Sequence, residues 1–101
     1  MLIYNVTTKV EWPVAEQWVE WMKNVHIPEI INTGCFTRFQ FVRLMEADEE
    51  DGPTYAVQFY APSRSDYDTY IYSFEGKHLF KTYDKWGDRV IAFRSLMEII
   101  N

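Results

Sequence analysis

The chain has a single cysteine, Cys35, and no long apolar run. One thiol cannot form an internal disulfide, which is typical of proteins in a reducing compartment. Asn5 and Thr7 interrupt the apolar N-terminal segment that a signal peptide would need, and no run approaches the roughly 20 apolar residues that span a membrane. We therefore expect a cytoplasmic protein with no membrane partner.

Basic charge is also scarce. The chain carries 10 Lys and Arg against 15 Asp and Glu, a net charge of −5, and its basic residues are scattered. Nucleic-acid binding needs a basic face that neutralises phosphates, so we expect no nucleic-acid partner. The acidic run "EADEEDG" at 46–52 lacks the alternating oxygen ligands and the terminal Glu of an EF-hand loop. We interpret it as a solvated loop.

Aromatic residues, in contrast, are abundant. They make up 18% of the 101 residues, within a hydrophobic content of 48% and a charged content of 25%. This length and composition predict one globular domain over 1–101. A domain this small has little interior for so much aromatic surface, so part of that surface is expected in a subunit interface or around a cavity.

Four segments have the pattern of strands, namely 2–10, 35–46, 54–61 and 90–100. They are rich in β-branched and aromatic residues and are bounded by polar or Gly- and Pro-containing stretches. The second and third are joined by the acidic run and are expected to form an antiparallel hairpin.

The first helix is predicted to begin at Pro13, which suits a first helical turn. Its apolar stripe follows helical spacing through Val14, Trp18, Trp21, Met22 and Val25. Pro28 lacks a backbone donor and disfavours helical geometry at the residue before it. We therefore expect the helix to break near 26–27, to restart for one turn and to stop at Gly34.

The second helix is predicted to begin at 63–65, where Ser63 and Ser65 are candidate caps. Its buried stripe is expected to contain Tyr67, Tyr70, Ile71, Phe74, Leu79, Tyr83 and Trp86. Gly76 loosens the helix, which is expected to continue to Gly87.

The element order β-α-β-β-α-β predicts an α+β, ferredoxin-like fold with a four-stranded antiparallel sheet whose first and third strands are central. The second and fourth predicted strands carry apolar residues on both of their alternating faces. Examples are Phe41 in the second strand and Phe93 in the fourth. A sheet with two apolar faces needs a second cover. We expect the same sheet of another copy, which makes the protein a homodimer through its outer sheet face.

This order with an apolar outer face resembles the dimeric α+β barrel superfamily. Four stretches are similar to one small bacterial family of uncharacterised proteins, a domain of unknown function: "IYNVT" (3–7), "WVEWMKNVHIPEIINTGCF" (18–36), "TYAVQFYAPS" (54–63) and "WGDRVIAFRSLME" (86–98). The resemblance implies the fold and a homodimer. It supplies no activity, no cofactor and no catalytic residues.

The two histidines are the first candidate site residues. His26 either lines a pocket between helix and sheet, as acid, base or ligand, or bonds the free carbonyls where Pro28 breaks the helix. His78 either faces solvent or a helix end, or faces the sheet. Haem ligation by His78 would follow only from superfamily analogy. Two histidines and one thiol do not make a zinc site, and we expect no metal or other cofactor.

Polar and aromatic side chains complete the candidate pocket. Asn5 and Gln58 lie mid-strand on neighbouring strands, with Arg94 near them, and either form a polar pocket floor or satisfy each other. The aromatic residues Trp18, Trp21, Trp86 and Tyr60 form either a wall around an organic ligand or plain core. Cys35 has no basic neighbour and is interpreted as a buried thiol.

No recognisable catalytic motif is present, so the sequence does not establish an enzyme. Three functions remain open. The first is a homodimeric small-molecule-binding or structural domain. The second is a cofactor-independent monooxygenase-like or isomerase-like enzyme acting on a small aromatic substrate positioned by His26, Asn5 and Gln58. The third is a protein-interaction module that uses its acidic surface.

Overall fold

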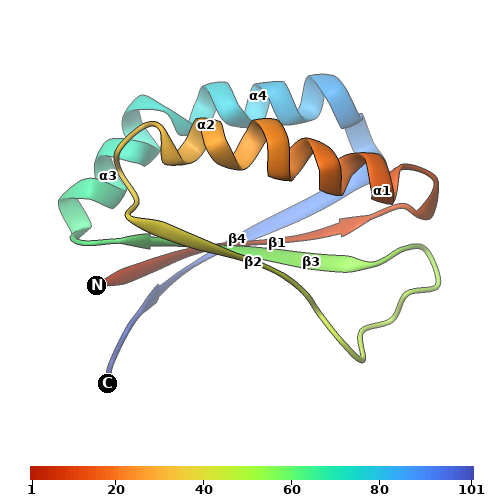
Figure 1. The fold of residues 1–101 in the computed structure, drawn as a ribbon, viewed down its shortest axis with the longest axis horizontal. Coiled ribbons are helices and arrows are strands. Elements are labelled where there is room, and N and C mark those ends of the chain that lie inside the picture. The colour runs from red at the N-terminus through yellow and green to blue at the C-terminus, as the bar shows by residue number, and fades with distance from the viewer.

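The computed structural model describes residues 1–101 and contains one four-stranded antiparallel sheet with all helices on one face (Figure 1). The strands are β1 (Leu2–Val10), β2 (Arg38–Arg43), β3 (Thr54–Ala61) and β4 (Val90–Glu98). The helices are α1 (Trp12–Trp21), α2 (Ile27–Ile31), α3 (Arg64–Ser73) and α4 (Glu75–Trp86), with a π-helical turn at Met22–His26 and a 3-10 turn at Gly87–Arg89. The predicted ferredoxin-like β-α-β-β-α-β fold is confirmed. None of these helices is both long and apolar enough to cross a membrane.

The strand order is β2-β3-β1-β4, which confirms that β1 and β3 are central. The two ends of the predicted second strand are wrong, because β2 begins only at Arg38 and ends at Arg43. Cys35 and Phe36 are buried in the core instead, after a turn in which Gly34 has a φ of 80°. A left-handed φ of this kind suits glycine, so the helical segment ends there as expected.

The predicted helix break at 26–27 is wrong. Ile27 keeps helical geometry (φ −62°, ψ −46°), and its N–H donates to the carbonyl of Met22, five residues earlier. In a regular α-helix the ring of Pro28 would clash with the carbonyl four residues before it. The extra residue in the π-helical turn relieves this conflict, so the chain continues from α1 into α2 without a break.

The second helical segment is divided two residues earlier than Gly76. Phe74 departs from helical geometry (φ −128°, ψ −32°) and separates α3 from α4. Ser63 is the N-cap of α3 and accepts a hydrogen bond from the backbone N–H of Asp66, as predicted. Within α4 the predicted buried stripe is confirmed at Trp86 and wrong at Leu79 and Tyr83, which are exposed, while Glu75 and His78 are buried instead.

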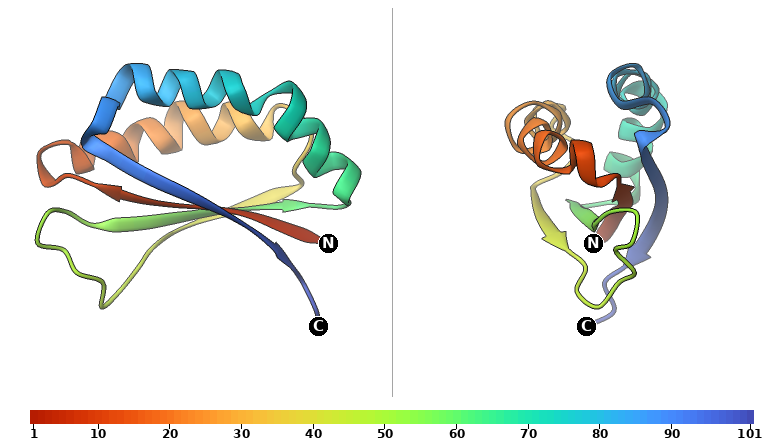
Figure 2. Two further views of the ribbon diagram at one scale, coloured as in Figure 1. Left: turned by 180° about the vertical axis from the view of Figure 1, so that it is seen from behind. Right: turned by 90° about the vertical axis from the view of Figure 1, so that its right-hand side faces the viewer.

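The core lies between the helices and the inner face of the sheet, while the outer face has no cover from this chain (Figure 2). Residues directly opposite each other on antiparallel strands share a face. The pairs Gln40–Gln58, Gln58–Asn5 and Asn5–Ser95 therefore form a polar row across the outer face. Ile91 and Phe93 lie on the same face and are 69% and 62% exposed.

Candidate functional site

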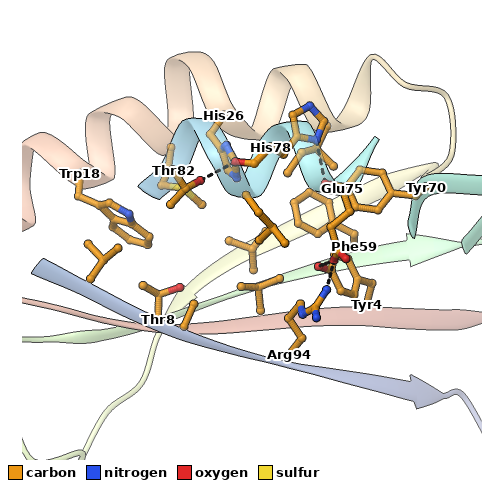
Figure 3. A pocket seen from close by; sticks show the side chains of 17 residues that line it. Tyr4, Thr8, Trp18, His26, Phe59, Tyr70, Glu75, His78, Thr82 and Arg94 are labelled. Atoms are coloured by element: carbon orange, nitrogen blue, oxygen red, sulfur yellow. Dashed lines mark hydrogen bonds and ion pairs between the residues drawn. The ribbon is translucent and has the colours of Figure 1, made fainter. Parts of the chain in front are cut away.

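A cavity of about 120 Å³ lies between the helical layer and the inner face of the sheet (Figure 3). Seventeen residues line it, and 11 of them are hydrophobic. An engineered apolar cavity of about 150 Å³ binds benzene, so a space of this size suits a compact ring rather than a large ligand. The site is therefore a small, mostly apolar chamber.

The cavity opens at the edge formed by α4 and β4. Its exposed lining residues are Leu79 of α4, and Ala92 and Arg94 of β4. The lining residues of α1, such as Trp18, are buried. A ligand would consequently enter between α4 and β4, and Trp18 would lie away from that opening.

Helical spacing explains how α1, the π-helical turn and α2 supply one wall. Trp18, Met22, His26 and Ile30 follow one another at intervals of four and all line the cavity. In a regular helix Val25 would follow Trp18 and Met22 towards the core, but it is 42% exposed. The extra residue in the π-helical turn shifts the inward position from Val25 to His26.

His26 contacts two aromatic rings. Its imidazole stacks on the indole of Trp21, with ring centroids 4.6 Å apart, and meets His78 edge to face at 5.9 Å. Burial, reinforced by the neighbouring His78, lowers the pKa of His26 to about 4. The imidazole is therefore neutral near pH 7.

The interpretation of His26 as a helix cap is wrong, because there is no break to cap and its Nδ1 is buried without a hydrogen-bond partner. The indole Nε1 of Trp18 in the same wall also has none. Buried polar atoms are nearly always paired, because an unpaired one costs about 1–3 kcal/mol. Two unpaired nitrogens in the side chains around one cavity therefore need an explanation.

His78 is buried, so the interpretation that it faces solvent is wrong. Its Nδ1 lies 2.9 Å from the hydroxyl of Tyr70, and its Nε2 lies 4.0 Å from a carboxylate oxygen of Glu29. Lys81 holds that carboxylate through a contact of 3.1 Å. Burial lowers the pKa of His78, which keeps this imidazole neutral as well.

A charged cluster of the buried Tyr4 and Glu75 with the half-exposed Arg94 forms the end of the cavity next to β4. The carboxylate of Glu75 accepts a hydrogen bond from the hydroxyl of Tyr4 and pairs with the guanidinium of Arg94 (Figure 3). Burial and the Glu75 carboxylate raise the pKa of Tyr4, and the same carboxylate raises the pKa of Arg94. Tyr4 thus stays a phenol and Arg94 stays a cation.

The structure brings together four of the seven candidate pocket residues: Trp18, His26, His78 and Arg94. The expectation that Asn5 and Gln58 form the floor of the same pocket is wrong, because they face each other on the outer side of the sheet. Asn5 donates to the hydroxyl of Thr7 at 3.0 Å. Tyr60 also lies on the outer face, where the guanidinium of Arg38 covers its ring at 3.8 Å.

Sequence reasoning missed five polar residues of the site: Tyr4, Thr8, Tyr70, Glu75 and Thr82. The sequence pattern identifies Tyr4 only as part of a strand and Tyr70 only as part of a buried helix stripe. Glu75 directly follows Phe74 of the predicted buried stripe, but the sequence predicts it to lie within a continuous helix, where a glutamate is ordinarily solvated.

No three His, Cys, Asp or Glu side chains are grouped so that they would hold a metal ion. Haem ligation by His78 does not fit this site. Both nitrogens of its ring face protein groups, Tyr70 on one side and Glu29 on the other, and the chamber is far too small for a porphyrin.

Solved structures with the same fold share little sequence with this chain. HapK from Hahella chejuensis matches with a TM-score of 0.72 and 13% identity over 99% of this chain and 93% of that chain. A protein of the ethyl tert-butyl ether d (ethd) family from Bacillus halodurans c-125 matches with a TM-score of 0.70 and 17% identity, over 99% of this chain and 100% of that chain. A putative antibiotic biosynthesis monooxygenase from Nitrosomonas europaea matches at 0.70 with 14% identity over the whole of both chains. At these identities the likeness establishes the fold alone.

The comparison with curated protein sequences gives no match. A family model described as "Domain of unknown function (DUF4286)" matches residues 1–100. The chain belongs to the DUF4286 family.

Proposed function

We propose that this protein is a homodimer that binds a compact, uncharged cyclic molecule in the cavity beneath its helices. The observation that carries the proposal is the pair of buried nitrogens without partners, Nε1 of Trp18 and Nδ1 of His26, in the walls of a largely apolar chamber. Ligand pockets are mostly apolar and contain a few placed polar groups. A ligand oxygen or nitrogen would supply the missing hydrogen bonds.

The charge state of the lining supports an uncharged ligand. Both imidazoles are neutral near pH 7, and the one full charge pair, Glu75 with Arg94, is already matched within the protein. A buried ion without a partner is strongly disfavoured. Phenols, small cyclic ketones and aromatic aldehydes have the required size, polarity and hydrogen-bonding group.

The proposal can be tested by ligand binding in NMR spectra of the labelled protein. Phenol, benzaldehyde and 2-cyclohexen-1-one should shift resonances of residues that line the cavity, whereas benzoate and benzylamine should not. Trp18→Phe and His26→Leu should weaken binding by roughly the worth of one hydrogen bond each, about 3- to 10-fold. Trp86→Phe is the matched control, because its indole nitrogen is also buried without a partner but the residue does not line the cavity.

If none of the neutral probes shifts the lining residues, or if Trp86→Phe weakens binding as much as Trp18→Phe, the ligand proposal is wrong. Loss of folding is excluded by recording the spectrum of each variant without a probe.

The homodimer part of the proposal concerns the outer sheet face. Exposed apolar residues on that face, Ile91 and Phe93, flank the polar row that contains Asn5 and Gln58. A second copy would cover both kinds of group, since amide side chains pair with one another and apolar ones pack. Two of the matching structures are dimeric ferredoxin-like proteins, one from an uncultured marine organism and one from Jannaschia sp. CCS1.

The free, buried thiol of Cys35 suits the reducing cytoplasm, which we propose as the compartment of this protein.

A further inference from the structure

His78 connects the interior of the cavity with the surface of the helical layer. On one side its Nδ1 lies 2.9 Å from the hydroxyl of Tyr70, which lines the cavity and is only 2% exposed. On the other side its Nε2 faces the carboxylate of Glu29 at 4.0 Å, too long for a hydrogen bond but close enough for a strong electrostatic effect. Three residues from three helices are thus arranged in the order phenol, imidazole, carboxylate (Figure 3 shows the Tyr70–His78 contact).

The carboxylate of Glu29 favours the tautomer of His78 that has its proton on Nε2, and the ammonium of Lys81, 3.1 Å from the same carboxylate oxygen, reduces this effect. A neutral imidazole has one N–H and one lone pair. The lone pair of Nε2 would be repelled by Glu29, whereas an Nε2–H is attracted to it. The favoured tautomer therefore leaves the lone pair on Nδ1, where it accepts the hydrogen bond that Tyr70 donates.

The two pKa shifts define the resting protonation state, and both must be overcome when the proton of Tyr70 moves to His78. Burial and the nearby Glu75 raise the pKa of Tyr70, while burial lowers the pKa of His78. The proton therefore rests on Tyr70, and His78 is an empty acceptor next to it. In catalytic triads a hydroxyl gives its proton to a histidine that a carboxylate orients. Tyr70, His78 and Glu29 have the same sequence of hydroxyl, imidazole and carboxylate.

We propose that Tyr70, His78 and Glu29 form a proton relay that interconverts the enolisable forms of a small cyclic ketone held in the cavity. The oxygen of Tyr70 takes a proton from the carbon next to the ligand's carbonyl, while the proton of Tyr70 moves to Nδ1 of His78. The electrons of the broken C–H bond pass into the ligand as an enolate. The imidazolium is stabilised by Glu29, and the reverse transfer returns the proton to the same carbon or to the far carbon of a dienolate. No oxidant, reductant or second substrate is consumed.

Trp18 supplies a free donor at the other end of the lining, since its indole N–H is a donor only and has no partner in the protein. Trp18 lies across the cavity from Tyr70 (Figure 3), so it can bind a distant polar group of a ligand but does not reach an enolate oxygen beside the carbon that Tyr70 deprotonates. Tyr70 is the catalytic residue, while His78 and Glu29 act through it.

This inference rests on the proposed ligand binding, and the test separates the two. The substrate is 3-cyclohexen-1-one, whose isomerisation to 2-cyclohexen-1-one moves one proton and creates a conjugated enone that absorbs in the ultraviolet. The wild type should accelerate this conversion, and Tyr70→Phe, which removes only the hydroxyl, should lower kcat by at least about 100-fold. Tyr67→Phe is the matched control, because it makes the same change one turn earlier on α3, outside the cavity, and should keep full activity.

A second measurement tests the positioning residues without using activity. The nitrogen-15 shifts of His78 should show the tautomer with hydrogen on Nε2, and Glu29→Gln should move the population towards the other tautomer. Glu29→Gln should also lower kcat more than it changes KM, and His78→Gln should lower kcat as strongly as Tyr70→Phe.

Each outcome decides one of the two proposals. If 2-cyclohexen-1-one binds in the cavity but 3-cyclohexen-1-one is not isomerised faster by the wild type than by Tyr70→Phe, the relay is overturned and the binding function stands. A His78 with hydrogen on Nδ1 also overturns the relay. If neither ketone binds but phenol or benzaldehyde does, the relay is overturned and the binding function stands. If none of these neutral probes binds, both proposals are overturned.

Discussion

The imidazole of His26 lies flat against the indole of Trp21, at an interplanar angle of 23° and a centroid distance of 4.6 Å. A neutral imidazole stacks well in a buried aromatic environment, but a charged one would lose its hydration there. The contact therefore makes folding depend on the protonation of this ring.

We predict that the protein loses stability as pH falls from about 6.5 towards 4. The folded-state pKa of His26 is lowered to about 4, so the unfolded chain binds the proton first and is favoured by acid. The contribution is fully present above about pH 6.5 and should fall by about 2 kcal/mol by pH 5. Urea denaturation at several pH values measures it.

His26→Asn provides the comparison for that experiment. The variant should show a flatter stability curve between pH 6.5 and 5, with the remaining slope due to His78, whose pKa is lowered in the same direction. Parallel curves for wild type and variant would show that the His26 ring is not buried in the folded state.

The sequence predicts the strands of this fold better than the inward faces of its helices, because strand alternation is easier to follow than helical phase. Strand alternation and the order of elements identified β1 and β3 closely, and the right-handed crossovers placed both at the centre of the sheet. Helical phase was less reliable, because one added residue changes every inward position after it. The π-helical turn at Met22–His26 moved His26 inward and Val25 outward, and a helix restart at Phe74 moved His78 inward and Leu79 outward.

The site was harder to predict than the fold for the same physical reason. Asn5 and Gln58 were correctly expected to be neighbours, but which face of a strand points to the helices is decided by tertiary packing when both faces are partly apolar. The burial of Glu75 could not be predicted from the sequence, because it depends on contacts with Tyr4 and Arg94, which are distant in the sequence.

Phe93→Asp should convert a dimer into a monomer. Phe93 is 62% exposed on the outer sheet face, so the substitution costs little in the isolated chain but places a charge in the proposed interface. Sedimentation at micromolar concentration should give half the wild-type mass. An interface of this kind should bury about 1,500–2,500 Å² in total.

Phe41→Asp is the control for the interface. Phe41 packs against Trp18 on the inner face, with ring centroids 5.9 Å apart, so this variant should unfold rather than dissociate. A wild type that sediments as a monomer at these concentrations would contradict the homodimer.

The acidic loop should be less tolerant of change than a solvated loop. Trp12 donates its indole N–H to the carbonyl of Glu49 at 2.8 Å, and Arg43 pairs with the side chain of Glu49 at the same distance. A Cβ on Gly52 would lie 1.8 Å from the carbonyl oxygen of Val10. We predict that Gly52→Ala lowers the free energy of unfolding by at least about 2 kcal/mol, measured by urea denaturation.

Gly76→Ala is the matched substitution for Gly52→Ala. Nothing lies within 4 Å of a Cβ at Gly76, which is inside α4. Alanine is the better helix former by about 0.5–1 kcal/mol, so this variant should be more stable than wild type. Equal effects of the two substitutions would show that the contact between Gly52 and Val10 does not exist.

The ion pair between Arg94 and Glu75 should reveal itself through a double-mutant cycle. Arg94→Met leaves the buried carboxylate of Glu75 without its cation, which should destabilise the fold by about 2–4 kcal/mol. This is at the low end for a buried pair, because the side chain of Arg94 is 46% exposed to water.

Glu75→Gln in the Arg94→Met background removes the unpaired charge while the amide oxygen still accepts the hydrogen bond from Tyr4. The double variant should therefore be more stable than Arg94→Met alone, and the coupling energy from urea denaturation should exceed about 1 kcal/mol. Additive effects of the two substitutions would mean that Arg94 points into solvent, and that the mouth of the cavity is lined by an unpaired carboxylate.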